Sequence, residues 1–337
     1  MRPTLATAIC ASVLCLYAAN AGRTAAAQGY EHFVVGNFAD VIRPTSGLTV
    51  LHGGGTDIDE IFVRMGAAAG GGDFVVIRAS GTDAYNPYIY ELCGCDSVET
   101  IIFKNRQAAF DPFVIGRIRN AEAVWIAGGD QSNYVTYWKG TPVEAELNAL
   151  AARPAPIGGL SAGTAIMGEF VYSAMSASSL TSSEGLADPF HRDLTLARDF
   201  LRLPNLDGLI TDQHLEERDR MGRTVAFLAR LVHDGWTADG RAVASDRETA
   251  LLLNPSTGTA EVISTKNHRT PFVYFLRASG PPEVCQPKTP LTYRNVGVYR
   301  IGPGGTFDLA AWRGSGGIAY TLSAESGVLT SSRGEIY

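Results

Sequence analysis

Short apolar runs rich in β-branched residues alternate with longer segments of helical period from about residue 48 onward. This alternation constrains the fold more than any other feature, because it is typical of a mostly parallel sheet with helices on its faces. The pattern predicts strands at residues 48–52, 74–78, 100–103, 123–127, 155–158 and 209–211. A chain of 337 residues can bury the core of one large α/β domain, which we place at residues 28–255.

The pattern of apolar and polar residues changes after residue 255. Short alternating strands, such as residues 273–276 and 296–301, are separated there by turns rich in glycine and proline. We therefore predict that residues 256–337 form a β-rich C-terminal extension packed on the α/β domain.

The first 27 residues have the pattern of a secretory signal peptide. Arg2 provides a positive start, residues 5–19 are almost free of polar side chains, and small residues follow at 25–27. An apolar run of about 15 residues is shorter than the roughly 20 that span a bilayer. We expect a secreted or periplasmic product with no membrane attachment after cleavage.

The net charge and the cysteine content limit which partners, disulfides and metal sites we expect. The net charge of −6 gives no electrostatic footprint for nucleic acid. Cys10 and Cys15 would leave with the signal, and an oxidising destination permits one disulfide among the other three cysteines. Cys93 and Cys95 are too close to pair comfortably, so we expect one of them to pair with Cys285, or all three thiols to stay reduced. No Cys or His spacing indicates a metal site, and no cofactor is expected.

Polar residues follow several of the predicted strands. The carboxyl ends of strands in open α/β sheets form the ligand-binding edge, so these turns should share one edge of the sheet. The turns are Gly53-Gly54-Gly55, Gly128-Gly129-Asp130-Gln131, Gly159-Leu160-Ser161 and Asp212-Gln213-His214.

Residues 159–163 fit the G-x-S-x-G pattern of a nucleophile elbow, with Ser161 at its centre. Small flanking residues are needed because the serine takes a strained backbone conformation on a sharp strand-to-helix turn. The amides of Ala162 and Gly129 are the candidate donors to an oxyanion.

A serine nucleophile needs a base, and His214 ends a predicted strand on the same edge. Asp246 and Glu248 are the candidate acids, with Glu248 favoured, and the order Ser161, His214 and then one of these acids is preferred because it places every member at a predicted strand end. The α/β-hydrolase order would instead be Ser161, Asp246 and His268.

Three arginines, Arg218, Arg220 and Arg223, follow His214 within a predicted helix over residues 216–233. Arginine binds carboxylates in bidentate fashion. Their position beside the proposed base favours a substrate that bears carboxylates.

Together these motifs resemble the signature of cyanophycinases, which are relatives of the aspartyl dipeptidases. The resemblance covers about residues 48–253 and implies a flavodoxin-like three-layer αβα sandwich, a homodimer and a Ser-His-Glu triad. It also implies the substrate cyanophycin, a poly-aspartate chain with arginine on each side-chain carboxyl, which is cut into β-aspartyl-arginine dipeptides. By matching positions, the residues that would shape the pocket are Gln131, Asp212, Gln213, Arg218, Arg220 and Arg223, with Glu184 as a further acid for substrate guanidinium groups.

The sequence departs from this family at the expected acid. The family commonly has Asp-Glu-x-Thr-Ala, whereas this chain has Asp246-Arg247-Glu248-Thr249-Ala250, with arginine where the glutamate is expected. Glu248 or Asp246 could replace it. Two other functions stay open at this point: a peptidase for short acidic peptides, and a secreted binding protein that lost its triad.

Overall fold

The computed structural model describes residues 29–176, 178–265 and 271–337. The predicted signal segment and His268 therefore lie outside the described residues. The helices are α1 (Asp59–Ala68), α2 (Tyr85–Cys93), α3 (Pro112–Asn120), α4 (Gln131–Trp138), α5 (Pro142–Ala152), α6 (Ala162–Ala165), α7 (Ser182–Ala187) and α8 (Met221–His233), with a 3₁₀ helix, η1, at Arg106–Phe110.

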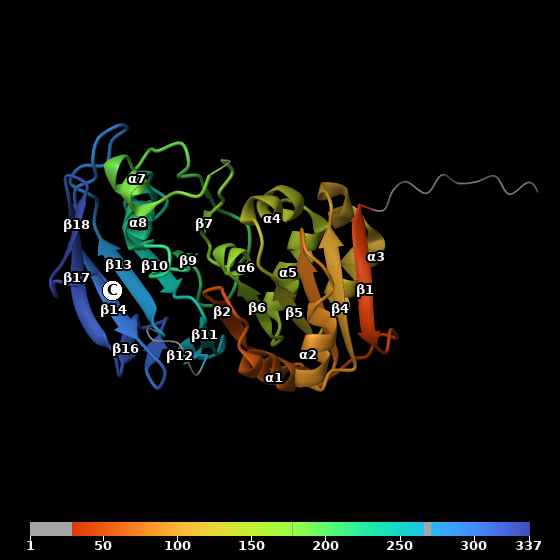
Figure 1. The fold of residues 1–337 in the computed structure, drawn as a ribbon. Coiled ribbons are helices and arrows are strands. Elements are labelled where there is room, and N and C mark those ends of the chain that lie inside the picture. The colour runs from red at the N-terminus through yellow and green to blue at the C-terminus, as the bar shows by residue number, and fades with distance from the viewer. Residues whose placement is uncertain (1–28, 177, 266–270) are drawn as a thin grey trace, which may run out of the picture.

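A ten-stranded mixed sheet runs across the molecule, from β1 on the right of Figure 1 to β16 at the lower left. Its five central strands are parallel, and the strands on either side of them are antiparallel. The order is β1 (Tyr30–Gly36), β4 (Ser97–Phe103), β3 (Asp73–Arg78), β5 (Ala123–Ile126), β6 (Ile157–Leu160), β2 (Thr49–His52), β11 (Thr249–Leu253), β12 (Thr259–Ser264), β15 (Thr306–Asp308) and β16 (Arg313–Ser315).

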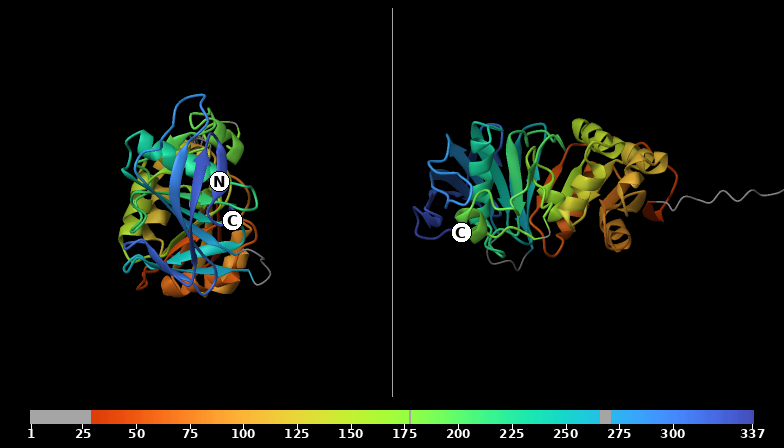
Figure 2. Two further views of the ribbon diagram at one scale, coloured as in Figure 1. Left: turned by 90° about the vertical axis from the view of Figure 1, so that its left-hand side faces the viewer. Right: turned by 90° about the horizontal axis from the view of Figure 1, so that it is seen from above.

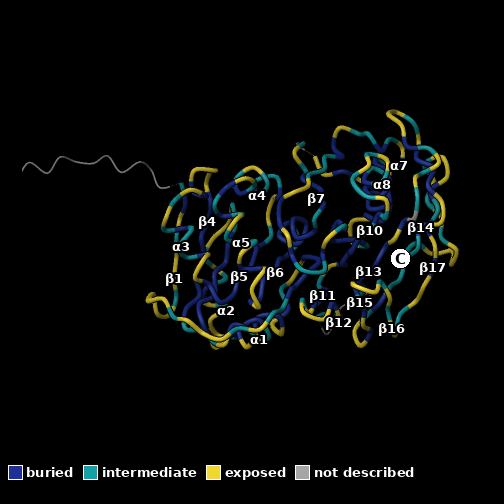
Figure 3. Tube along the Cα trace, turned by 180° about the vertical axis from the view of Figure 1, so that it is seen from behind, coloured by how far each residue is buried: buried dark blue, intermediate teal, exposed yellow. Residues whose placement is uncertain are grey.

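Helices cover both faces of the parallel strands, because those strands are apolar on both faces. In β3, Val75 and Ile77 pack with residues of α3, α4 and α5. Phe74 and Val76 alternate with them and pack with residues of α1 and α2 on the other face. Figure 3 shows these central strands as buried and the rims as exposed. The α/β class is therefore confirmed, while the flavodoxin-like detail stays a prediction.

A second, six-stranded sheet lies on the left of Figure 1. Its order is β18 (Val328–Ser331), β17 (Ile318–Glu325), β14 (Tyr293–Ile301), β13 (Val273–Ser279), β10 (Asp239–Ser245) and β9 (Leu209–Gln213), and a separate pair joins β7 (Val171–Tyr172) to β8 (Leu196–Ala197). The strand predicted at residues 209–211 thus belongs to this sheet and not to the sheet of β2–β6. Only β9 and β10 are parallel here.

The two sheets share residues from both sides of position 255. Strands β12, β15 and β16 extend the ten-stranded sheet, whereas β13, β14, β17 and β18 extend the sheet that β9 and β10 begin. The two sheets also pack on one another, since the rings of Phe275 and Phe307 stack with centroids 3.6 Å apart. The views in Figure 2 show the resulting elongated molecule.

The cysteine prediction is wrong in its pairing. Cys93 forms a disulfide with Cys95, two residues away, across Gly94 in the left-handed region at the end of α2. Cys285 is a buried free thiol, and burial raises its pKa to about 12. Within the described ranges, none of the helices combines the length and apolar character needed to cross a membrane.

Candidate active site

A cavity of about 220 Å³ opens beside Ser161. It lies where turns from the two sheets meet, and polar side chains form most of its wall. The lining residues are Gly129, Asp130, Gln131, Ser161, Ala174, Ser176, Ser178, Ser179, Gln213, Arg218 and Arg220.

Ser161 sits on the sharp turn that the sequence predicts. It lies between β6 and α6 and has φ 53° and ψ −111°, a strained conformation for a residue with a side chain. A Cβ on Gly159 would lie 2.6 Å from the carbonyl carbon of Gly163, and a Cβ on Gly163 would lie 2.0 Å from the carbonyl oxygen of Ile126. Only glycine therefore permits this close packing on both sides of the serine.

Backbone and side-chain hydrogen bonds hold the elbow in place. The amide of Ser161 donates to the carbonyl of His52 at 3.0 Å. The Thr164 hydroxyl lies 2.7 Å from the same carbonyl and 2.6 Å from that of Gly159. The threonine at this position thus joins α6 to the ends of β2 and β6.

His214 reaches the serine from the other sheet. It follows β9 with φ 52°, and its Nε2 lies 2.9 Å from Ser161 Oγ. The amide of His214 donates to the carbonyl of Gly53 at 2.8 Å. A Cβ on Gly54 would come within 2.2 Å of His214 Nε2, so glycine at this position gives the imidazole its space.

The acid beside His214 is Glu217, which the sequence interpretation did not choose. Its Oε2 lies 2.6 Å from His214 Nδ1. Glu248, the favoured candidate, instead accepts hydrogen bonds from the hydroxyls of Thr56 at 2.9 Å and Thr265 at 3.2 Å. Arg247, which stands where the resemblance implies the glutamate, forms an ion pair with Glu248 at 2.9 Å and lies 3.9 Å from Glu217.

Asp246 contacts the backbone of the turn that carries this acid. Its buried Oδ1 accepts hydrogen bonds from the backbone amides of Glu216 at 3.2 Å, Glu217 at 3.4 Å and Arg247 at 2.8 Å. The carboxylate therefore fixes the turn that carries Glu217 to the end of β10. The carboxylate that the structure brings to His214 Nδ1 is thus Glu217, three positions along the chain, and not the predicted Glu248.

Burial and neighbouring charges set the protonation of the site. Burial lowers the pKa of His214, and the hydrogen bond that its Nδ1 donates to Glu217 opposes that shift. The pKa of Glu217 is itself lowered, because the contact with His214 outweighs the effect of burial. Beneath the elbow, burial and the charge of His214 lower the pKa of His52 to about 3. A neutral His214 can then accept the hydroxyl proton of Ser161 near neutral pH.

Two predicted pocket residues, Arg223 and Asp212, are not among the residues that line the cavity. Arg223 and Asp212 are buried at 0% and 1% exposure and form a bidentate ion pair, with Nε to Oδ2 at 3.0 Å. Thr224 Oγ1 also donates to Asp212 Oδ2 at 2.8 Å. Burial alone would raise the pKa of Asp212, but the charge and hydrogen bonds of Arg223, together with Arg220 and Thr224, outweigh burial and lower the pKa.

Arg220 is the buried cation that faces the cavity. It donates to the carbonyl of Gln213 at 2.9 Å and to Ser179 Oγ at 3.4 Å, and no described carboxylate lies within ion-pair distance of it. Burial and the charge of Arg223 lower its pKa to about 10. The more exposed Arg218 and the amides of Gln131 and Gln213 line the same space, as predicted.

Glu184 does not line this cavity. Its Oε2 accepts hydrogen bonds from the Thr181 amide at 2.9 Å and hydroxyl at 2.7 Å, which completes a capping box at the start of α7. The proposed amides are better placed: Gly129 lines the cavity, and Ala162 directly follows Ser161. Their role as oxyanion donors stays a prediction.

Some lining residues were missed by sequence reasoning. Ser176, Ser178 and Ser179 come from a serine-rich stretch that precedes α7, and Asp130 lies beside the predicted Gln131. The serine enrichment was the available signal.

Helix α8 begins at Met221, and residues 215–219 form turns where a helix was predicted. Those turns are what bring Glu217 back to His214.

One protein-family model matches part of this chain. Residues 85–187, which include the elbow, match the model of Peptidase family S51. The chain is a serine-type peptidase. A search of the curated proteins found no match to this peptidase.

Two solved structures resemble the peptidase at low sequence identity. A peptidase from an acI-B1 Actinobacterium is 14% identical with a TM-score of 0.49, and the match covers 70% of this chain and 96% of that one. A candidate peptidase E protein from Listeria monocytogenes EGD-e is 13% identical with a TM-score of 0.41, and the match covers 66% of this chain and 99% of that one.

The contact between His214 and Glu217 predicts a measurable pKa. We expect the His214 pKa to lie below the free value of about 6.5, and to fall further in Glu217→Gln, because the hydrogen bond that favours the imidazolium is lost. Titration of the imidazole proton signals by NMR measures both values. Glu248→Gln is the matched control and should leave the His214 pKa in place; a larger shift in Glu248→Gln than in Glu217→Gln would contradict the assignment.

The buried pair of Arg223 and Asp212 predicts a large stability effect. Arg223→Met should lower the free energy of unfolding by about 3–5 kcal/mol, because it leaves a buried carboxylate without its counter-charge. Arg218→Met, whose side chain is 51% exposed, should change it by less than about 0.5 kcal/mol. Urea denaturation compares the two variants, and equal stabilities would contradict the role given to Arg223.

Proposed function

We propose that Ser161, His214 and Glu217 form the catalytic triad of this peptidase. The observation that carries the proposal is the continuous contact from Ser161 Oγ to His214 Nε2 and from His214 Nδ1 to Glu217 Oε2. His214 takes the hydroxyl proton as Ser161 attacks the peptide carbonyl, and Glu217 stabilises the imidazolium that forms. The imidazolium then protonates the leaving amine. Water releases the acyl group by the same route, with the Ala162 and Gly129 amides facing the oxyanion.

The proposed substrate is cyanophycin, from which the enzyme would release β-aspartyl-arginine dipeptides. The polymer carries both signs of charge, as does the cavity wall. Arg218 and Arg220 offer guanidinium groups for substrate carboxylates, and Asp130 offers a carboxylate for substrate guanidinium groups. The polar hydroxyls and amides between them suit a peptide backbone.

A short acidic peptide is the second candidate substrate. The observation that favours it is the excess of two arginines over one aspartate in the lining, which matches a substrate richer in carboxylates than in guanidinium groups. The binding-protein alternative rested on Arg247, and it loses that support because Glu217 occupies the place of the acid.

Export from the cytoplasm belongs to the same proposal. The disulfide between Cys93 and Cys95 supports it, because disulfides persist in oxidising compartments such as the periplasm and the cell exterior.

One assay tests the function. Purified protein incubated with insoluble cyanophycin should release β-aspartyl-arginine, detected by mass analysis of the soluble fraction, and Ser161→Ala should slow release at least about a thousandfold. Glu217→Gln should lower the rate by about a hundredfold to ten-thousandfold, whereas Glu248→Gln should have little effect. Cleavage of free aspartyl dipeptides without release from the polymer would favour the second candidate. Unchanged release by Ser161→Ala would end both.

Arg220 should govern the preference for charge. Arg220→Met is expected to lower kcat/KM about tenfold to a hundredfold for a substrate with a free carboxylate, since one charge-assisted hydrogen bond is lost. The matched measurement uses the same substrate with that carboxylate amidated. An equal loss for both substrates would show that Arg220 only supports Gln213 and Ser179, and would contradict carboxylate recognition.

A further inference from the structure

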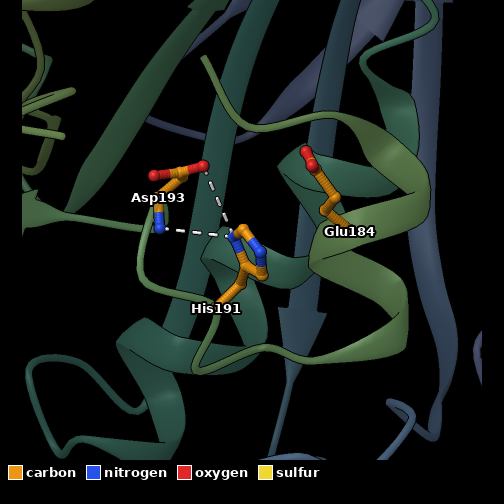
Figure 4. A group of neighbouring side chains, drawn as sticks. All are labelled: Glu184, His191 and Asp193. Carbon is orange, nitrogen blue, oxygen red and sulfur yellow. Dashed lines mark hydrogen bonds and ion pairs between the residues drawn. The ribbon is translucent and has the colours of Figure 1, made fainter. Parts of the chain in front are cut away.

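Three side chains with metal-ligating atoms lie close together, near the segment of Ser178 and Ser179 that lines the cavity. Glu184 lies in α7, and His191 and Asp193 lie in the loop that follows it (Figure 4). One ligand atom from each residue lies within 4.8 Å of the other two. In Figure 4 the imidazole of His191 lies between the two carboxylates, with an oxygen of Asp193 facing His191 Nδ1 at 3.8 Å.

Asp193 is an unusual member of this group. It is 3% exposed, and its carboxylate accepts no hydrogen bond from the described residues. Its ion-pair neighbours are His191 at 3.8 Å and Arg192 at 3.6 Å, and the Arg192 side chain is 84% exposed. Buried carboxylates are normally paired, hydrogen-bonded or bound to a metal, because desolvation of an unpaired charge is costly.

The other two residues are arranged to serve as ligands. The capping box uses Oε2 of Glu184, which leaves Oε1 for another partner. The amide of Asp193 donates to His191 Nδ1 at 3.3 Å, which orients the ring toward this group; a metal ion bound at Nδ1 would replace that long hydrogen bond. Two carboxylates and one neutral imidazole would balance the charge of a divalent cation.

We propose that Glu184, His191 and Asp193 bind one divalent transition-metal ion, of the class of Zn²⁺ or Mn²⁺. One nitrogen and two oxygen ligands suit such an ion, whereas Ca²⁺ takes oxygen ligands only. With three protein ligands, the remaining coordination positions would be filled by water. This site is separate from the proposed triad and does not depend on it.

The position of the proposed metal site indicates how a bound ion would act on the active site. Ser182, in the first turn of α7, accepts hydrogen bonds from the amides of Gly222 at 3.0 Å and Arg223 at 3.3 Å at the start of α8. Ser178 and Ser179, a few residues before α7, line the cavity beside Ser161. A metal ion that joins α7 to the loop at residue 193 would therefore hold the segment that shapes one wall of the active site.

The test measures metal binding directly. Full-length protein is treated with a chelator, dialysed, and titrated with ZnCl₂ and with MnCl₂ by calorimetry, while thermal melting is followed in parallel. We expect one equivalent of at least one of the two ions to bind and to raise the melting temperature. His191→Ala and Asp193→Asn should each weaken binding by at least about tenfold and remove the rise.

The exposed pair of His233 and Asp234, 3.0 Å apart, offers a matched control. His233→Ala should bind the ion as the unaltered protein does. Failure of both ions to bind, or unchanged binding in His191→Ala, would overturn the proposal. A melting-temperature rise with CaCl₂ equal to that with ZnCl₂ would overturn the assignment to a transition metal.

Discussion

The close approach between the Gly53-Gly54 turn and the ring of His214 is the contact on which the active site depends. Ser161 belongs to the ten-stranded sheet and His214 to the six-stranded sheet, so neither sheet holds the pair alone. The turn after β2 joins them, because the carbonyl of Gly53 accepts the His214 amide and Gly54 leaves room for the imidazole. Any side chain at position 54 would occupy the space of the base.

The buried pair of Arg223 and Asp212 has a similar role for the cavity. Ordinarily a buried ion pair contributes little net stability, because desolvation offsets the attraction between the charges. Here it fixes the end of β9 against the first turn of α8, and Ser179 and Leu180 add further acceptors for Arg223. Arg220 and Arg223 both donate to Ser179 Oγ, so the buried pair also helps to position the residues that orient Arg220.

The sequence predicted those parts that local patterns determine. The apolar runs located β2 to β6 to within a few residues, and the small residues around Ser161 predicted the elbow, because a strained serine needs glycine neighbours. Strand-end placement also identified His214. All of these follow from interactions between residues close in sequence or from a rule for parallel sheets.

Other features depend on tertiary packing, and the sequence did not reveal them. The transfer of β9 to the second sheet depends on pairing with β10, which cannot be read from either strand alone. Glu217 was hidden in a run of alternating charges that is typical of an exposed helix, and only the turns at residues 215–219 bring it to His214. The Cys93–Cys95 disulfide was dismissed on sequence distance, although Gly94 permits the left-handed backbone between the two cysteines.

The spacing of His214 and Glu217 has a further consequence. Since base and acid lie three residues apart, they arrive together in one short peptide, and the geometry between them does not depend on a distant strand. What the rest of the protein must supply is an anchor for that peptide, and the carboxylate of Asp246 is part of it. A designer who moved this pair to another scaffold would need to transplant the peptide from His214 to Glu217 and to rebuild its anchors, which include Asp246 and the Gly53-Gly54 turn.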